Sequence, residues 1–361
     1  MPNEQAATLD NRISSQETAK TGTQLLYPVL GTNGKWGYID TEGTVIIDYI
    51  YDKADFFKEG LAAVSSDGKW GFINPDGIFI IKPQYDFCSG FKEGLSKVVI
   101  TEGNTRKTGF INKEGETFFR SFLNGNAGNF SEGLAVFEKD GLYGYIDTNG
   151  NICINPQYTY AGEFSEGLAV VVDENCMYGY IDRNGQVKIQ AQYPFNGIEY
   201  LQYLDFHDGL SLVEIEGKSG FINTDGDIAI EAVFDNARNF SEGLAQVQTG
   251  GKWGYINTNG EWVINPEYKH CTKFQEAYAF VKPFDDEEAK GSSQGLTEDF
   301  MIIDANGNVV SNTTVSYPYG GGYTFPMEWH TGFVGELARV IVDEVGFAYI
   351  NKSGDIIWLM E

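Results

Sequence analysis

The sequence predicts an all-β protein made of about nine tandem repeats, each a three-stranded antiparallel meander. The first observation is a phrase, "GKWGYIDTEGTVII", that returns 34 residues later as "GKWGFINPDGIFII" and once more as "GKWGYINTNGEWVI". The second is another phrase, F-x-E-G-L-A-x-V, which alternates with the first along the chain. The third is composition, because 44 glycines against 10 prolines suit many tight turns. Two phrases in fixed order indicate a repeat architecture.

The repeat units are counted on the glycine of Trp-Gly. The spacing between copies ranges from 34 to 47 residues, which gives nine units in 361 residues. The copies are centred on Gly37, Gly71, Gly109, Gly144, Gly179, Gly220 and Gly254, with degenerate copies at Met301 and Ala348.

Residues 60–82, "GLAAVSSDGKWGFINPDGIFIIK", show why one unit is expected to be a meander. Three short apolar runs, 61–64, 70–73 and 78–81, are separated by the turns "SDGK" and "NPDG". The second turn recurs in all nine units as Asn or Asp followed by Gly three residues later. Such a side chain opens the turn and the glycine closes it with a positive φ, as in a type I turn with a G1 bulge.

The glycine of Trp-Gly falls in the middle of a strand, where glycine costs roughly 0.5 to 1 kcal/mol relative to alanine. Its recurrence predicts a close approach over the missing side chain. We expect that approach to come from the adjacent unit, with Phe57, Phe91 or Tyr85 as candidate rings. Each unit is too small to bury its own aromatic residues, so each copy is expected to complete the core of the next.

The arrangement of the units is less determined by the sequence. The array begins with "LLYPVL" and ends with "DIIWLM", so no unit is visibly split between the termini, and nine exceeds the usual 4 to 8 propeller blades. We therefore expect an open, twisted, solenoid-like stack, with a closed β-propeller as the alternative.

The phrases "GKWGYIDTEG" and "FFKEGLAAV" resemble the WG-repeat family of bacterial β-repeat proteins, and the resemblance covers roughly residues 25–361. Units three to six replace the tryptophan, and the last two units also lose the glycine. The resemblance implies a tandem β-repeat and carries no shared catalytic motif or cofactor. The replacements are Thr108, Tyr143, Tyr178 and Ser219.

Charge and composition narrow the partners. Acidic residues outnumber basic ones 51 to 25, for a formal charge of −26, which disfavours nucleic acid and anionic membrane. The sequence shows neither an apolar stretch long enough to span a bilayer nor a signal peptide, so a soluble, cytoplasmic protein is expected. The four cysteines lack the pairing of a metal site and are expected to be small apolar fillers.

No catalytic, metal-binding or cofactor-binding motif is visible, and we expect the protein not to be an enzyme. The acid of F-x-E-G recurs and could line up to bind cations or a basic partner. We favour the interpretation that these acids cap turn N–H groups or lie solvated at an edge. They are Glu59, Glu93, Glu132, Glu166, Asp208, Glu242 and Glu276.

Departures from the repeat suggest where binding could occur. Insertions lie at 191–206, at the acidic 284–300 and at 311–330, "SNTTVSYPYGGGYTFPMEWH". The last insertion suits a protein or glycan contact, or alternatively a cap over the end of the stack. Its candidate binding residues are Tyr317, Tyr319, Tyr323, Phe325 and Trp329.

The chain is expected to comprise a disordered tail at 1–24, regular repeats at 25–283 and degenerate repeats at 284–361 that form a cap. A short helix that docks on a partner is the alternative for the tail. The function predicted is a non-enzymatic protein-binding or scaffold module, with carbohydrate binding by the inserted aromatic residues as the alternative. The partner would be another protein, or a glycan under the alternative.

Overall fold

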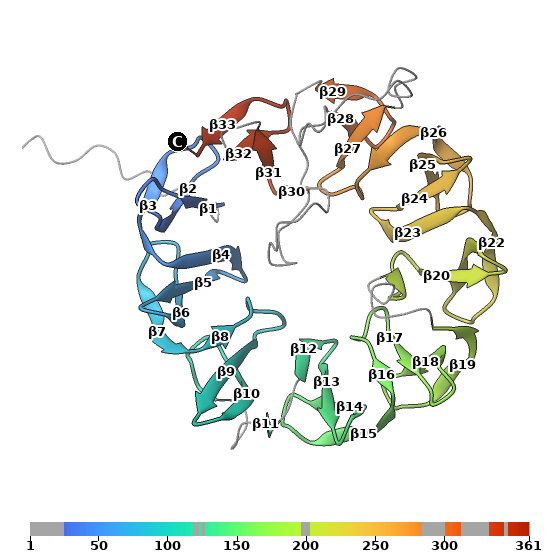
Figure 1. The fold of residues 1–361 in the computed structure, drawn as a ribbon, viewed down its shortest axis with the longest axis horizontal. Helices are drawn as coiled ribbons and strands as arrows, with labels where there is room; N and C mark the ends of the chain where they lie inside the picture. Colours follow the sequence, from blue (N-terminus) through green and yellow to red (C-terminus); the bar gives the residue numbers. More distant parts are fainter. Residues whose placement is uncertain are drawn as a thin grey trace, which may run out of the picture.

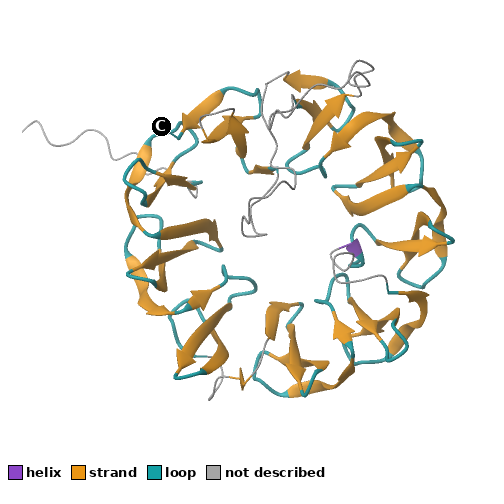
Figure 2. Cartoon of the chain, in the orientation of Figure 1, coloured by secondary structure: helices purple, strands orange, loops and turns teal. Residues whose placement is uncertain are grey.

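The computed structural model describes residues 25–117, 123–124, 127–195, 203–283, 300–311, 332–342 and 346–360. These residues form 33 strands in small antiparallel sheets (Figure 1). The sheets follow one another around a centre and form a ring, and strands dominate the described chain (Figure 2). The predicted all-β class and the tandem repeat are confirmed.

The sheets correspond to nine blades. Blades 7 and 8 are joined into one seven-stranded sheet because β26 runs from one into the other. Blades 1 to 3 contain β1 (Tyr27–Leu30), β2 (Trp36–Ile39), β3 (Val45–Tyr51), β4 (Lys53–Lys58), β5 (Leu61–Ser66), β6 (Lys69–Ile73), β7 (Phe79–Tyr85), β8 (Phe87–Cys88), β9 (Ser96–Glu102), β10 (Thr105–Ile111) and β11 (Leu123–Asn124). Blades 4 to 6 contain β12 (Ala127–Ser131), β13 (Leu134–Lys139), β14 (Leu142–Asp147), β15 (Ile152–Tyr158), β16 (Tyr160–Ala161), β17 (Leu168–Val172), β18 (Met177–Asp182), β19 (Val187–Pro194), β20 (Leu210–Ile215), β21 (Lys218–Asn223) and β22 (Ile228–Phe234). Blades 7 to 9 contain β23 (Asn236–Ser241), β24 (Leu244–Thr249), β25 (Lys252–Asn257), β26 (Trp262–Cys271), β27 (Tyr278–Pro283), β28 (Met301–Asp304), β29 (Val309–Ser311), β30 (Phe333–Val334), β31 (Leu337–Val342), β32 (Gly346–Asn351) and β33 (Ile356–Leu359).

Blade 2 shows how the repeat sequence makes a blade. The meander β5-β6-β7 is the predicted one, and the turn before β7 has the predicted chemistry. Asn74 Oδ1 accepts hydrogen bonds from the N–H groups of Asp76 and Ile78, and Gly77, with φ of 76°, donates its N–H to the carbonyl of Asn74. Hydrogen bonds within residues 74–78 therefore hold the turn.

The structure adds a fourth strand that the sequence interpretation omitted. In blade 2 the segment "KADFFK" forms β4, which pairs with β5 in antiparallel register. Most blades gain such an inner strand, which lies nearest the centre of the ring (Figure 1). The second phrase thus contributes the inner strand and the turn that leads into the meander.

The Trp-Gly glycine is required for a different reason from the one predicted. A Cβ on Gly71 would lie 2.4 Å from the carbonyl oxygen of Ile81 and 2.7 Å from the nitrogen of Pro83. Both atoms belong to β7 of the same blade, where residues 82–84 bulge opposite the glycine. The close approach is confirmed, but its assignment to the adjacent unit is wrong.

The last blade supports this explanation. There Ala348 takes the place of the glycine, and it pairs directly with Leu359. No residues are inserted between the pairs Ala348 with Leu359 and Tyr349 with Trp358. Glycine is therefore needed only where the outer strand bulges over it.

Neighbouring blades share their hydrophobic cores, as predicted. Between blades 2 and 3, one buried cluster joins Phe72 and Ile81 to Phe91 and Val98. Phe72 and Phe91 contact each other with ring centroids 4.7 Å apart. The same pairing, of the aromatic after Trp-Gly with the phenylalanine of the next arm, recurs as Tyr38–Phe57, Phe110–Phe130, Tyr145–Phe164, Tyr180–Phe206, Phe221–Phe240 and Tyr255–Phe274.

The first and last blades also pack together, so the arrangement is the closed β-propeller and the expectation of an open stack is wrong. Tyr27 and Tyr349 contact each other with ring centroids 5.5 Å apart. The Tyr27 hydroxyl donates to the carbonyl of Val334 at 2.8 Å, and the Tyr349 hydroxyl donates to that of Pro28 at 3.0 Å. Blades 9 and 1 lie side by side in the ring (Figure 1), and side-chain contacts rather than a split blade join them.

Candidate functional site

A series of acids lies at the inner turns of the blades. Each acid comes directly before the glycine of its turn, or before Ala277 in the case of Glu276. Each adopts a left-handed backbone, with φ between 51° and 55°. This conformation is uncommon for residues other than glycine, so neighbouring contacts must hold it. The acids are Glu59, Glu93, Glu132, Glu166, Asp208, Glu242 and Glu276.

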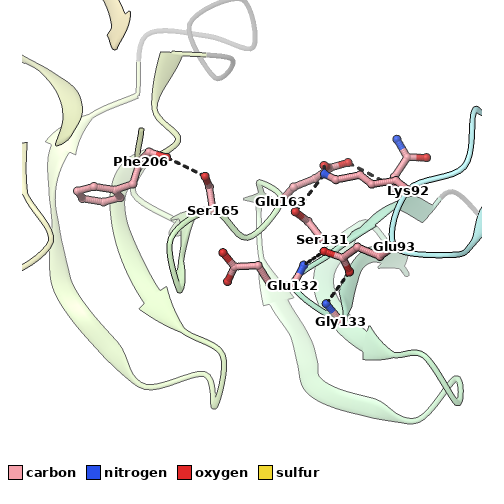
Figure 3. A network of polar contacts seen from close by, with 9 residues as sticks. Lys92, Glu93, Ser131, Glu132, Gly133, Glu163, Ser165 and Phe206 are labelled. Atoms are coloured by element: carbon pink, nitrogen blue, oxygen red, sulfur yellow. Dashed lines mark hydrogen bonds and ion pairs between the residues drawn. The ribbon is translucent and has the colours of Figure 1, made fainter. Parts of the chain in front are cut away.

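Six of these carboxylates accept hydrogen bonds from the turn of the next blade. Glu59 accepts from the N–H of Gly94 at 3.0 Å. Glu93 accepts from the N–H of Gly133 at 2.9 Å (Figure 3). Four more carboxylates accept from a backbone N–H in the same way. The acceptor and donor pairs are Glu132 and Gly167, Glu166 and Gly209, Asp208 and Gly243, and Glu242 and Ala277. The acids therefore cap turns, as the favoured interpretation held, and these six link successive blades from blade 2 to blade 8.

One basic residue strengthens this inner network (Figure 3). Lys92 in blade 3 donates to the hydroxyl of Ser131 at 3.0 Å and to Glu163 Oε2 at 2.9 Å. It thereby connects blade 3 with residues that belong to blades 4 and 5. Burial, aided by the nearby charge of Glu163, raises the pKa of Asp205 to about 6, although Lys92 acts in the opposite direction.

Exposed apolar side chains occur at the outer strands. Ile50 is 57% exposed and Val233 is 61% exposed. Each stands near the end of an outer strand that has a partner on one side only, β3 and β22 respectively. The other exposed apolar residues of outer strands are Val45, Ile46, Ile80, Ile152, Val187, Ile228, Trp262, Val263, Val309, Val310 and Ile356.

A cavity of about 350 Å³ lies beside blade 6. Tyr178 and Phe195 of blade 5, Ser219 of blade 6 and Ala237 and Arg238 of blade 7 are among the residues that line it. Ser219 stands where three other units carry tryptophan. The replacement of tryptophan by serine was therefore visible in the sequence. The cavity that forms here was not predicted from it.

The candidate binding residues from the sequence, Tyr317, Tyr319, Tyr323, Phe325 and Trp329, lie outside the described residues. So do the predicted tail at 1–24 and most of the acidic insertion at 284–300. Those predictions, including the proposed cap, stay predictions.

The cysteines match their predicted role only in part. Cys88 and Cys271 are buried, and burial raises the pKa of the Cys271 thiol to about 11. Cys153 and Cys176 are exposed, so the prediction of apolar fillers is wrong for these two. Within the described ranges no cluster of three or more His, Cys, Asp or Glu side chains could hold a metal ion.

The fold and the repeat define a class of protein, a nine-bladed closed β-propeller whose blades share one sequence motif. The chain belongs to the family described as WG containing repeat, whose model matches the larger part of it. The matched segments are residues 36–70, 70–102, 125–143, 143–175, 178–218, 220–253 and 253–282. This confirms the family resemblance.

Solved structures align with the chain at low sequence identity. The crystal structure of a eukaryotic initiation factor aligns with a TM-score of 0.62 at 11% identity, over 92% of this chain and 95% of that one. BamB from Moraxella catarrhalis aligns with a TM-score of 0.36 at 11% identity, over 67% and 78% of the two chains. Kluyveromyces lactis Hsv2 aligns with a TM-score of 0.34 at 10% identity, over 82% and 87%. The first of these shows a shared fold alone.

No curated protein sequence matches the chain. In the part of the chain that the structure describes, there is no helix with the length and apolar character needed to cross a membrane.

Proposed function

We propose that this protein is a non-enzymatic protein-binding module that docks an extended, basic segment of a partner protein against its outer strands. The observation that carries the proposal is the exposure of Ile50 and Val233 on β3 and β22. An outer strand with one free side offers unpaired N–H and C=O groups to which another strand can add. Exposed apolar side chains on such a strand give the added segment something to bury.

The repeat itself shows how these two edges differ from the corresponding strands of three other blades. At the position of Ile50 and Val233, the strands β7, β15 and β26 carry a polar side chain, and a proline precedes it. Proline and polar side chains are typical of outer strands that do not accept an added strand. The protected sequences are Pro83–Gln84, Pro156–Gln157 and Pro266–Glu267. Blades 1 and 6 lack the proline and carry an apolar side chain, whereas β19 of blade 5 lacks the proline but keeps the polar Gln192.

The charge of the chain supports the nature of the partner. With a formal charge of −26, the protein attracts basic segments and repels acidic ones. The inner acids that cap turns are already hydrogen-bonded to backbone N–H groups, so they serve the fold in this proposal. The outer strands then provide the contact, and the negative charge of the whole protein provides the preference for basic segments.

The test starts from a partner purified on the full chain from cells of its source. The partner's bound segment is identified by cross-linking and titrated by calorimetry into wild-type protein and the double variant Ile50→Gln/Val233→Gln. Both changes introduce the residue that other repeats carry at this position, so the fold should tolerate them. We expect at least about a tenfold loss of affinity, equivalent to about 1.4 kcal/mol.

Leu142→Gln is the matched control, because Leu142 is 38% exposed but lies on β14, which is paired on both sides. It should bind the segment as the wild type does. A segment that binds the double variant unchanged, or that cross-links away from β3 and β22, would contradict the proposal. The carbohydrate-binding alternative depends on residues 311–330 and stays a prediction.

A further inference from the structure

Blade 2 shows the usual surroundings of the repeat tryptophan. Lys69 forms an ion pair with Asp86 across the end of the blade. Between the strands, Trp70 lies directly opposite Tyr85, and it packs against the core shared with blade 3. Blade 1 has the same ion pair and the same opposed rings. The indole thus packs at the boundary between one blade and the next, and the residues beside the two opposed rings form a lysine–carboxylate pair.

Blade 6 keeps the ion pair and the opposed aromatic residue but has no tryptophan. Lys218 and Asp235 form the equivalent ion pair, with Nζ and Oδ1 2.6 Å apart. On the adjacent strand, Phe234 lies opposite Ser219 as Tyr85 lies opposite Trp70. The side chain of serine is smaller than that of tryptophan by the whole ring, and the cavity lies at this position.

The walls of the cavity suit a flat aromatic ring with a polar edge. Tyr178, Tyr203 and Leu212 provide aromatic and apolar surface, and Ala237 closes the side toward blade 7. Arg238 also lines the cavity, and its guanidinium carbon lies 5.1 Å from the centroid of the Trp253 ring. That stacking holds the arginine at the wall, where its planar group can face a second ring.

The carboxylate of Glu214 gives the cavity a chemical preference. Glu214 lies opposite Ser219 on the neighbouring strand and is exposed. A carboxylate accepts a hydrogen bond from a ring N–H and repels an acidic ligand. The volume, about 350 Å³, falls at the lower end of the roughly 300–1,000 Å³ of small-molecule pockets.

We propose that this cavity binds an indole-type ring in the place that the repeat tryptophan occupies in other blades. The ring is supplied either by a tryptophan side chain of a partner or by a free indole compound. The bound ring makes the packing contacts that tryptophan makes in other blades and that the small side chain of Ser219 cannot make. This site is separate from the outer strands of blades 1 and 6, so it does not depend on the strand-addition proposal.

The test titrates two probes, indole and N-acetyl-tryptophanamide, into the full chain and follows saturation-transfer NMR signals. N-acetyl-leucinamide serves as the aliphatic control and should give no saturable signal. The wild type and Ser219→Ala, which keeps the space, should bind at least one aromatic probe. Ser219→Trp should lose saturable binding and raise the melting temperature by about 2 °C or more, because the new ring fills the cavity.

Ser219→Tyr, which copies the residue that blade 5 carries at this position, provides a second filled cavity if the tryptophan variant does not fold. Binding of N-acetyl-tryptophanamide would point to a partner's side chain, and binding of indole alone to a small molecule. Absence of binding by both probes, or equal binding by the filled variants, would overturn the proposal. The variant Ile50→Gln/Val233→Gln should bind the probes as the wild type does, which separates this result from the test of the outer strands.

Discussion

The junction between blades 2 and 3 and the junction between blades 9 and 1 solve the same packing problem with different residues. Between blades 2 and 3, Phe72 packs on Phe91, and Glu59 caps the N–H of Gly94. Between blades 9 and 1, two tyrosines pack on each other. Here Tyr27 belongs to β1 itself, and its hydroxyl accepts the N–H of Glu336 at 3.0 Å.

The difference follows from chain connectivity. The internal cap joins residues 35 positions apart, whereas the Tyr27 to Val334 bond joins residues 307 positions apart. Loop-closure entropy makes the longer connection about 2 kcal/mol more costly. The closing junction therefore needs contacts as good as the internal ones, and tyrosine combines a ring for packing with a hydroxyl for hydrogen bonding.

The largest effect is expected from Tyr349→Ala. This change removes the ring that contacts Tyr27 and the hydroxyl that donates to Pro28, and it should lower the free energy of unfolding by about 3 to 5 kcal/mol. Hydrogen exchange should also rise in β1 and β33, because the ring opens there first. Phe91→Ala is the internal counterpart, with a similar loss of stability but no faster exchange in β1. Equal exchange in the two variants would contradict a separate role for the closing junction.

The next largest effect is expected at the bulge. Gly71→Ala should cost about 2 to 3 kcal/mol, because the new Cβ meets backbone atoms at 2.4 and 2.7 Å and the outer strand must shift. Denaturant unfolding would measure the change. Gly128→Ala is the matched control, since its nearest neighbour lies 3.6 Å from the added Cβ, an ordinary contact. If Gly71→Ala left the free energy of unfolding unchanged, the bulge would not require glycine. The explanation of why the last blade can carry Ala348 would then fail.

A smaller, pH-dependent effect is expected between blades 5 and 6. Because the folded pKa of Asp205 is raised to about 6 from an ordinary 3.8, the folded state holds this proton more tightly than the unfolded state does. Its contribution is fully present below about pH 4 and is lost as the pH rises through 6. Asp205→Asn should remove that loss and stabilise the protein at pH 7 by about 1 to 2 kcal/mol, with little change at pH 4. Chemical unfolding at the two pH values checks this, and equal stabilisation at both would contradict it.

The smallest effect is expected from the internal caps. Glu93→Ala removes the acceptor of the Gly133 N–H and should cost about 1 kcal/mol, since water can replace the lost partner at this exposed turn. Thermal unfolding of the variant beside Glu114→Ala, an exposed acid for which no cap is described, would measure it. A loss no greater than that of the control would mean that the caps order the turns without stabilising the ring.

The parts of the fold that the sequence predicted depend on residues close together in the chain. Turns such as Asn74 to Gly77 are local, and the capping of turn N–H groups by the acids was predicted without indicating that the capped turn, such as that of Gly94, belongs to the next blade. The partner of Gly71 was misassigned because the bulge of residues 82–84 leaves no distinct pattern in the hydrophobic alternation. Pro83 was the available signal, since proline in a strand commonly marks a bulge or an edge.

Closure of the ring and the candidate sites were harder to predict for a physical reason. Tyr27 occupies the register position that Ala62 holds in blade 2, so the repeat phrases do not identify it as a junction residue. The contact it makes lies more than 300 positions away. The cavity at Ser219 had a signal in the sequence, but a missing ring becomes a cavity only when the neighbouring blades keep their places.

The most direct test of the closed ring compares two pairs of spin labels at equivalent turns. Glu42 and Ser353 lie in blades 1 and 9, Asp76 and Glu114 lie in blades 2 and 3, and all four positions are exposed. The exposed Cys153 and Cys176 are first replaced by serine, while the buried cysteines stay. Pulsed dipolar spectroscopy should give closely similar distance distributions for the two pairs, because blades 9 and 1 are neighbours in a closed ring. A distribution for Glu42 and Ser353 that is clearly longer and broader than the internal one would contradict closure.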